Sequence, residues 1–295
     1  MTVDPMTIDP VSAPTLTGAE AAKALGRIRE LLAADRLVPY LGPDLLAIEG
    51  AVSVPVTPEQ VAAALNKRTP APARVRTNMW GTAQYIDSRK HRRTLTAYMA
   101  EIFAGAPQPT AFHHWLAAQK LGMIVDSWYD GTMRAALDAA GRSDVVEIQG
   151  ITRAGIHFDQ WYRAYDIAGS EVATAAAETA RSLLYCPHGS ISPANNFLVA
   201  DSDYVEVLTE IDIQTPIPQT VRVRRASRGF LFLGCRFHDQ MLRTYARQII
   251  KRSEGPHFAI ANAAGLTRNE AKFYAGAGIT LIDAGLDAVV TALMA

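Results

Sequence analysis

The stretch Leu183-Leu184-Tyr185-Cys186-Pro187-His188-Gly189-Ser190 is an apolar run that ends in a turn containing a histidine and a glycine. Two other segments have the same layout, MIVDSWYD at 123–130 and FLFLG at 230–234. A short apolar run bounded by turn residues is typical of a strand buried on both faces. Open α/β sheets hold their ligands beyond the carboxyl ends of such strands, so these three ends predict where a site lies.

Helical patterns separate the apolar runs along the chain. Further strands are predicted at 37–41, 145–148, 257–260 and 279–282, and helices at 17–35, 240–252 and 269–276. Thr17 and Glu20 fit a capping box, and Asp239 is expected to cap the helix at 240–252. Strands that alternate with helices form a mainly parallel sheet with both faces covered, so the predicted fold class is α/β.

The sequence predicts one large domain with two unusual segments. Residues 1–16 are rich in proline and are predicted to be a flexible N-terminus, followed by an α/β domain over 17–295. Helical patterns from about 50 to 120 predict a helical insertion beside the sheet. A second segment, about 150–180, contains Trp161, Tyr162, Tyr165 and an Ala-rich tract, and we expect it to be partly helical.

The composition is that of an ordinary folded protein, with 295 residues of which 49% are apolar. Lys plus Arg and Asp plus Glu both number 29, so no net field favours nucleic acid or an anionic membrane as partner. No window reaches the ~18 continuous apolar residues of a spanning helix, and the N-terminus lacks a signal-peptide pattern. We therefore expect a cytoplasmic protein whose two cysteines, Cys186 and Cys235, are free thiols.

Taken together and in this order, the strand ends resemble the sirtuin-like family of NAD-processing domains over nearly all of residues 31–292. In that family the first strand ends in Gly-Ala-Gly and the second in Thr-Thr-Asn-Tyr-Asp; a His-Gly-Ser piece follows, and a fourth strand ends in Gly with a downstream Asp. The matching residues are Gly42, Tyr129, Asp130, His188, Gly189, Ser190, Gly234 and Asp239. The resemblance implies a Rossmann-like sheet with helices on both faces and a helical insertion.

The resemblance also implies a ligand and a reaction. These residues would line a cleft for NAD, as substrate or ligand, or for another ADP-ribose-type nucleotide. Cleavage of the nicotinamide glycosidic bond needs a base beside a ribose hydroxyl or water, and His188 would be that base, since an imidazole with a pKa near 6.5 accepts protons at neutral pH. Prokaryotic members without the zinc module commonly act as NAD glycohydrolases. Zinc-dependent deacetylation is not expected, because that activity accompanies a four-Cys zinc module.

Two positions depart from the family's pattern. Trp128 stands where the family has Asn, and its indole has one donor, no acceptor and a bulk that would fill the nicotinamide pocket. Gly42-Pro43-Asp44 replaces Gly-Ala-Gly, which removes a backbone amide and places the Asp44 carboxylate where a pyrophosphate would approach. Asp44 and Trp128 are therefore expected at the cleft, with weak or altered turnover.

Other interpretations stay open at this point. A catalytically degenerate domain would be a regulatory module for a protein partner or a homo-oligomer, and His188 would then only hydrogen-bond a neighbouring carbonyl. Cys186 with His188 and Cys235 with His238 form two pairs that could hold a soft metal, although their spacings are not those of an established finger and the main prediction includes no metal ligand. The cluster Arg222, Arg224, Arg225 and Arg228 is predicted to be a solvated helix face.

Overall fold

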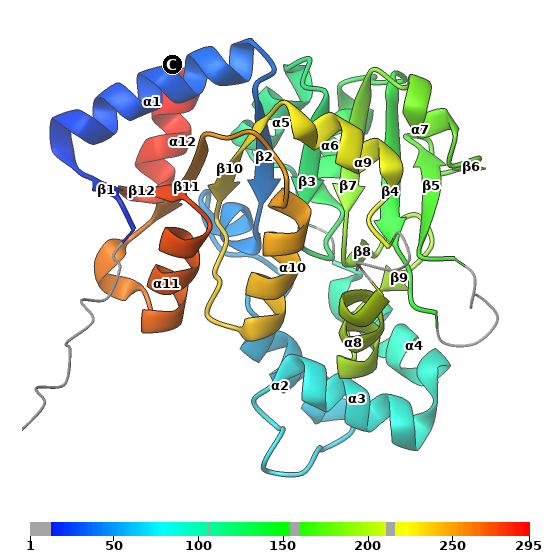
Figure 1. Ribbon diagram of the computed structural model, residues 1–295. Helices are drawn as coiled ribbons and strands as arrows, with labels where there is room; N and C mark the ends of the chain where they lie inside the picture. The colour runs from blue at the N-terminus through cyan, green and yellow to red at the C-terminus, as the bar shows by residue number, and fades with distance from the viewer. Residues whose placement is uncertain (1–12, 106, 154–159, 211–215) are drawn as a thin grey trace, which may run out of the picture.

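The computed structural model describes residues 13–105, 107–153, 160–210 and 216–295. Within these ranges a ten-stranded sheet has the order β1-β12-β11-β10-β2-β3-β7-β4-β5-β6 (Figure 1). Its strands are β1 (Thr15–Leu16), β2 (Leu37–Leu41), β3 (Met123–Asp126), β4 (Val145–Gly150), β5 (Tyr162–Asp166), β6 (Glu171–Val172), β7 (Ser182–Cys186), β10 (Gly229–Leu233), β11 (His257–Ala261) and β12 (Ile279–Asp283). Following this order, every neighbouring pair from β1 through to β4 is parallel. At the far edge, β5 pairs antiparallel with β4, and β6 pairs antiparallel with β5.

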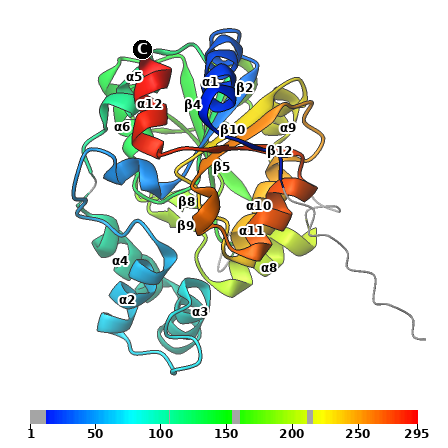
Figure 2. The same cartoon turned by 90° about the vertical axis from the view of Figure 1, so that its left-hand side faces the viewer.

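Helices cover both faces of this sheet (Figure 2). One layer contains α1 (Gly18–Ala33), α5 (Ala111–Ala118), α6 (Thr132–Ala139) and α12 (Leu286–Met294). The other contains α7 (Ala176–Thr179), α8 (Asp201–Glu210), α9 (Gln219–Ala226), α10 (Gln240–Ile250) and α11 (Arg268–Gly276). The predicted α/β class, with a mainly parallel Rossmann-like sheet between two helical layers, is confirmed.

Successive side chains of the strands alternate between two hydrophobic cores, one on each face of the sheet. In β10, Phe230 and Phe232 belong to one buried cluster, whereas Leu231 and Leu233 belong to the other. Successive side chains of a strand point to opposite faces, and a parallel strand with helices on both sides must be apolar on both. Each such side chain contributes roughly 1.5–3 kcal/mol by leaving water, which explains why uninterrupted apolar runs specify these strands.

The helical insertion consists of α2 (Pro58–Arg68), α3 (Met79–Lys90) and α4 (Arg92–Phe103), which lie beyond the carboxyl edge of the sheet (Figure 1). The side chain of Thr57 accepts a hydrogen bond from the Gln60 amide and caps α2. The next helix, α5, leaves the insertion and packs beside α6 and α12. The insertion is therefore shorter than the predicted 50–120.

The segment at about 150–180 is described except for residues 154–159. Its described part contains the short helix α7 and also the hairpin of β5 and β6, which the sequence did not predict. Gly169 has a φ of +101° in the turn, where the Asp166 side chain accepts a hydrogen bond from the Ser170 amide. This turn and the burial of Tyr165 beside β4 favour the hairpin, whereas part of the Ala-rich tract that follows forms α7.

Two expectations for the start of the chain change as well. Thr15 and Leu16 form β1, which pairs with β12, although the sequence predicted a flexible terminus up to residue 16; residues 1–12 lie outside the described ranges. Thr17 is the N-cap of α1 but makes no side-chain capping bond. Gly18 has a φ of +50°, which takes the first turn away from capping-box geometry. No helix within the described ranges is both long and apolar enough to cross a membrane.

Candidate functional site

The sheet has a topological switch point beside β2. The chain first builds β3, β4 and β7 on one side of β2, and later β10, β11 and β12 on the other. Chains that continue from the two sides of such a switch point can leave a crevice at the carboxyl edge of the sheet. A cavity of about 350 Å³ lies there, and its lining comes from the ends of β2, β3 and β10 and from the start of the insertion, including Asp44, Val56, Glu59, Ser127, Trp128, Arg236 and His238.

A second cavity of about 310 Å³ continues along the same edge, over the ends of β10, β11 and β12. Gly234, Asn262 and Gly285 contribute to its lining. The two cavities share Asp44, Cys235 and Arg236. They are therefore neighbours, with one acidic and one basic side chain at their common boundary.

Gly42 and Gly234 meet at this edge. A Cβ on Gly42 would collide with the carbonyl oxygen of Gly234, so only glycine allows the two turns to approach this closely. The Gly42 amide donates to the carbonyl of Leu233 at 2.8 Å, and the Asp44 amide donates to the carbonyl of Gly234 at 3.1 Å. These amides are thus used inside the protein rather than presented to an anion.

Trp128 forms one wall of the larger cavity. Its side chain is only 3% exposed, and its Nε1 donates a 2.8 Å hydrogen bond to the carbonyl of Pro55, just before α2. The rings of Phe103 and Tyr129 pack around it at centroid distances of 6.2 and 5.2 Å. The cavity persists beside this indole, so the bulk of Trp128 narrows the cleft without closing it.

The polar side chains of the larger cavity interact across it. His238 Nε2 lies 3.0 Å from Glu59 Oε1. This contact connects the loop after β10 with the first turn of α2. Burial raises the pKa of Asp44, although the nearby Arg236 and His238 act in the opposite direction. Arg236 is half exposed, and its Nε lies 3.5 Å from Glu270. The cleft therefore combines two carboxylates with one permanent cation.

His188 lies outside both cavities. Its ring is 2% exposed, its Nδ1 is 2.9 Å from the hydroxyl of Tyr204, and the ring of Tyr245 packs edge-on at a centroid distance of 4.8 Å. Burial lowers the pKa of His188 to about 3, so the imidazole is neutral at physiological pH. The expectation that His188 opens onto the cleft is not met, and its role as a base stays a prediction.

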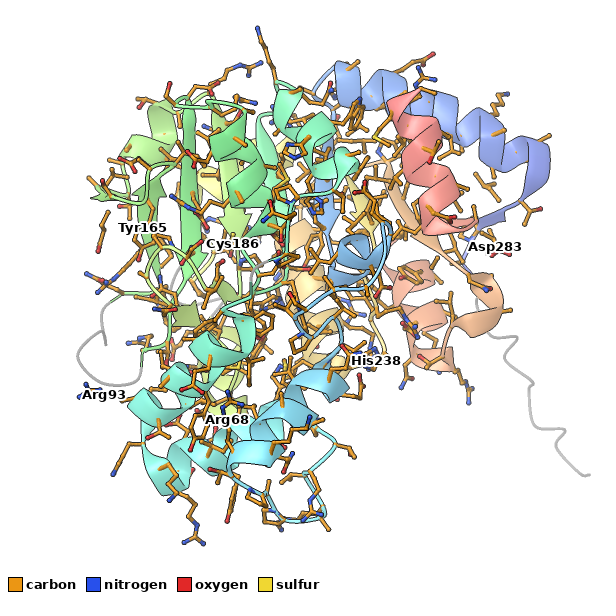
Figure 3. The ribbon with its side chains drawn as sticks, turned by 180° about the vertical axis from the view of Figure 1, so that it is seen from behind. Arg68, Arg93, Tyr165, Cys186, His238 and Asp283 are labelled. Carbon is orange, nitrogen blue, oxygen red and sulfur yellow. The ribbon has the colours of Figure 1, made fainter. Side chains whose placement is uncertain are left out.

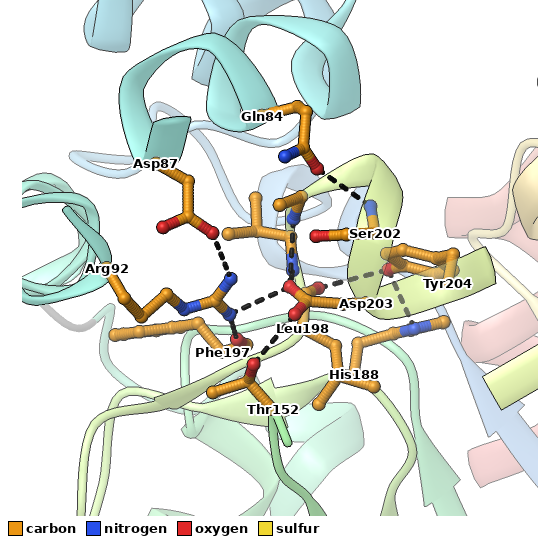
Figure 4. Close-up of polar contacts among 12 residues, drawn as sticks. Gln84, Asp87, Arg92, Thr152, His188, Phe197, Leu198, Ser202, Asp203 and Tyr204 are labelled. Carbon is orange, nitrogen blue, oxygen red and sulfur yellow. Dashed lines mark hydrogen bonds and ion pairs between the residues drawn. The ribbon is translucent and has the colours of Figure 1, made fainter. Parts of the chain in front are cut away.

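Helix α8 covers His188 and is itself held by a buried ion pair (Figure 4). The carboxylate of Asp203 accepts hydrogen bonds from Arg92 of the insertion at 2.7 Å and from Thr152 at 2.8 Å. Its oxygens also accept from the amides of Val199 and Ala200. These bonds fix the start of α8 and so keep Tyr204 against the imidazole.

The remaining predicted site residues have structural contacts and line neither cavity. Tyr129 donates to the carbonyl of Leu198, Asp130 accepts from the Thr132 amide at the start of α6, and Ser190 donates to the carbonyl of Tyr129. Gly189 has a φ of +79° in the hairpin of β8 (Gly189–Ser190) and β9 (Asn196–Phe197). Asp239 caps α10 as predicted, by accepting from the Met241 amide at 2.7 Å.

The hypothetical Cys/His metal site does not form. In the described part of the chain, no group of three or more His, Cys, Asp or Glu side chains is placed to hold a metal ion. Cys186 donates to Glu147 and Cys235 to the carbonyl of Tyr40, and the two thiols belong to different cores. Figure 3 shows Cys186 well apart from His238. Both cysteines are free, and burial raises the pKa of each thiol well above its usual value.

Of the four residues of the arginine cluster, Arg222 is exposed as predicted, but the other three are not part of a solvated face. The guanidinium of Arg224 donates to four backbone carbonyls, including those of Gly122 and Ala180, and Arg225 donates to those of Gln248 and Ile249. Arg228 pairs with Asp35 at 2.5 Å. Arg224 and Arg225 lie on α9 and Arg228 follows its end, and the partners of these side chains lie up to 193 residues away.

Several cavity residues had no role in the sequence prediction. Glu59, Ser127 and Arg236 line the larger cavity, and His238 was considered only as a metal ligand. Arg236 and His238 directly follow the strand that ends in Gly234, so the strand-end rule pointed to them. Glu59 carried no such signal, because it arrives from the helical insertion.

The sequence model of the SIR2-like domain matches residues 122–282, which is more than half of the chain. The match runs from the start of β3 to β12 and includes Trp128, His188 and His238. The search of curated proteins found no match. The order of strand ends, the switch-point crevice and this match lead to one conclusion, that the chain belongs to the SIR2-like domain family.

Proposed function

We propose that this SIR2-like domain binds NAD or an ADP-ribose-type nucleotide in the two neighbouring cavities. The observation that carries the proposal is their arrangement: about 350 and 310 Å³, side by side at the switch point, with three shared lining residues. Each falls in the usual size range of a ligand pocket. An elongated ligand with a ring system at each end would have its nicotinamide ribose in the larger cavity and its adenosine in the smaller.

Arg236 is the group that would hold the diphosphate in this arrangement. It lies at the boundary of the two cavities and is half exposed, and a guanidinium fork binds phosphate oxygens in pairs. Asp44 lies at the same boundary and would repel the diphosphate by about a kcal/mol or more in a partly dry site. The affinity for the diphosphate would therefore be modest, and the turn after β2 would donate few backbone amides to the phosphates.

Isothermal titration calorimetry with ADP-ribose, NAD and nicotinamide tests the proposal. We expect ADP-ribose and NAD to bind, and Arg236→Gln to weaken both by roughly tenfold or more, because a charge-assisted hydrogen bond contributes about 1.5–3 kcal/mol. Arg27→Gln, an exposed change on α1, is the matched control and should have no effect. Absence of heat with both nucleotides, at concentrations up to the millimolar range, would overturn the proposal.

A second candidate, a catalytically degenerate regulatory module, is favoured by the Trp128–Pro55 hydrogen bond and by the burial of His188. In that case the domain would present its surface to a protein partner or to a second copy of itself. Thermal unfolding separates the two functions. A ligand at 100 times its Kd stabilises the folded state by about 2.7 kcal/mol, whereas a module without a nucleotide site gives no shift. NAD cleavage and a cytoplasmic location remain predictions.

A further inference from the structure

A further cavity, of about 730 Å³, lies at the amino edge of the sheet. Its lining includes the residues that directly precede three parallel strands: Gly122 before β3, Arg181 before β7 and Arg228 before β10. The other lining residues come from α9 and from the end of α7, and Figure 1 shows both helices toward the edge of the sheet opposite the insertion. Because the strands run from this edge to the cleft, the amino-edge cavity is separate from the candidate nucleotide site.

The amino-edge cavity has a net positive charge. Three of its lining residues are arginines, and only Arg228 has a carboxylate partner, Asp35. Arg224 donates to backbone carbonyls, as does the exposed Arg181, and neither lies within ion-pair distance of a carboxylate in the described part of the chain. Partial burial and the nearby Arg228 lower the pKa of Arg224. Glu178 is the one carboxylate in the lining, so together with Asp35 it leaves an excess of cations.

An exposed apolar side chain borders the same cavity. Val223 of α9 is 61% exposed, and it lines the cavity together with Gln219, Thr220 and Arg224, which lie at helical spacing on one face of α9. The other large apolar side chain that is exposed among the described residues is Val205 of α8, which is outside this lining. Fixed positive charge beside an apolar side chain is complementary to a ligand that has carboxylates beside an apolar group.

We propose that the amino-edge cavity is a docking site for an acidic peptide segment of a protein partner. The guanidinium of Arg181 would donate to a carboxylate of the segment, and an apolar side chain of the segment would cover Val223. Arg224 would attract the segment through its charge alone, because its two terminal nitrogens already donate to four carbonyls. Nucleic acid is disfavoured, since its binding requires positive charge along many phosphates, whereas this chain has no net charge and the excess is local.

Fluorescence anisotropy with a labelled octapeptide of alternating glutamate and leucine tests the proposal. We expect this peptide to bind, and the same peptide with glutamine in place of glutamate not to bind. Its affinity should fall with added salt, because exposed charges are screened beyond roughly 8 Å at physiological ionic strength. No binding of the acidic peptide up to the millimolar range would overturn the proposal. Equal or tighter binding of labelled single-stranded DNA of the same length would also overturn it, in favour of a nucleic-acid site.

Two pairs of variants assign the binding to this cavity. Arg181→Glu should weaken peptide binding by roughly tenfold, because it reverses the charge that faces the carboxylates. Arg222→Glu makes the same change at an exposed residue outside the lining, and we expect about a twofold effect at most. Val223→Ser should weaken binding roughly threefold through lost apolar contact, and its control Val205→Ser should have no effect. Equal losses within both pairs would show that the peptide binds elsewhere.

Methyl NMR of the wild-type protein makes the test independent of variant folding. The acidic peptide should shift the methyl signals of Val223 and leave those of Val205 unchanged. Saturating ADP-ribose should not displace the peptide, because the two sites lie at opposite edges of the sheet. If the peptide binds and the Val223 signals do not move, the docking site is wrong and the nucleotide proposal is unaffected. If ADP-ribose fails to bind while the peptide shifts Val223, only the nucleotide proposal fails.

Discussion

The indole nitrogen of Trp128 donates a 2.8 Å hydrogen bond to the carbonyl oxygen of Pro55, which connects the end of β3 to the residues just before α2. At this position the family pattern has an Asn for the ligand. The tryptophan instead holds the wall of the cleft that contains Val56 and Glu59. Trp128 therefore anchors the residues that precede α2, and Glu59 in the first turn of α2 lies 3.0 Å from His238.

Replacement of Trp128 should loosen that wall. We expect Trp128→Phe to cost about 1–3 kcal/mol of unfolding free energy, because the Pro55 carbonyl loses its donor. Trp128→Asn should cost about 3–5 kcal/mol, since it also removes a large buried ring. Urea unfolding followed by circular dichroism measures both. Trp115→Phe on α5 retains the stacked contact with Phe112 and should cost less than about 1 kcal/mol; an equal cost would contradict the anchoring role.

Asp44 should limit diphosphate affinity in a pH-dependent way. Burial raises the pKa of this carboxyl, so it becomes neutral at a higher pH than an exposed Asp. A protonated Asp44 therefore stabilises the folded state at pH values below the usual pKa of Asp. This stabilisation is lost as the pH rises through the pKa of Asp44 in the folded protein. ADP-ribose affinity should fall over the same rise, as the charged carboxylate repels the diphosphate.

Calorimetry of Asp44→Asn checks this expectation. The variant should bind ADP-ribose roughly fivefold more tightly than wild type at neutral pH, corresponding to about 1 kcal/mol. Its affinity should also vary less with pH. Asp138→Asn, an exposed change on α6, serves as the control. Weaker binding by Asp44→Asn would show that this carboxylate contacts the ligand favourably.

His188 should make the protein sensitive to acid. Its pKa is about 3 when folded against 6.5 for a free histidine, so between these values the unfolded chain binds a proton that the folded chain does not. The stability contribution is fully present above pH 6.5 and is lost as the pH falls, by at most about 1.4 kcal/mol per pH unit. His188→Gln should flatten unfolding free energy measured from about pH 5 to 7. Burial also lowers the pKa of His113, to about 4, so His113→Gln should flatten the same pH dependence to a similar degree. If His188→Gln left the pH dependence of the unfolding free energy unchanged, the His188 ring would be solvated.

Arg92 should be the most sensitive ion-pair residue of the insertion. Arg92→Ala leaves the buried carboxylate of Asp203 without its cation, and removal of one partner of a buried pair typically costs about 3–5 kcal/mol. The matched control lies on the same insertion: Arg68 pairs with Glu101, whose side chain is 62% exposed, and Arg68→Ala should cost about 1 kcal/mol or less. Thermal and urea unfolding measure the two costs. Equal losses would contradict the view that Asp203 is the centre of a buried network.

Much of the fold could be predicted from local patterns. The apolar runs at 123–125 and 230–233 lie in β3 and β10, because a strand between two helical layers is apolar on both faces. Asp239 could be identified as a cap from its position before a helix. The hairpin at 162–172 was not predicted: β5 forms between β4 and β6, and these pairings are not visible in the local sequence pattern.

The candidate site, like the fold, could be predicted only in part from local patterns. The strand-end rule indicated the carboxyl edge of the sheet, where Asp44, Trp128 and Gly234 line the two cavities. It did not indicate which histidine reaches the cleft. His188 is covered by Tyr204, 16 residues later, and His238 meets Glu59, 179 residues earlier. Periodicity and turn residues act over a few positions and so fix strands, helices and caps, whereas the exposure and partners of a side chain depend on contacts between segments that are distant in the chain.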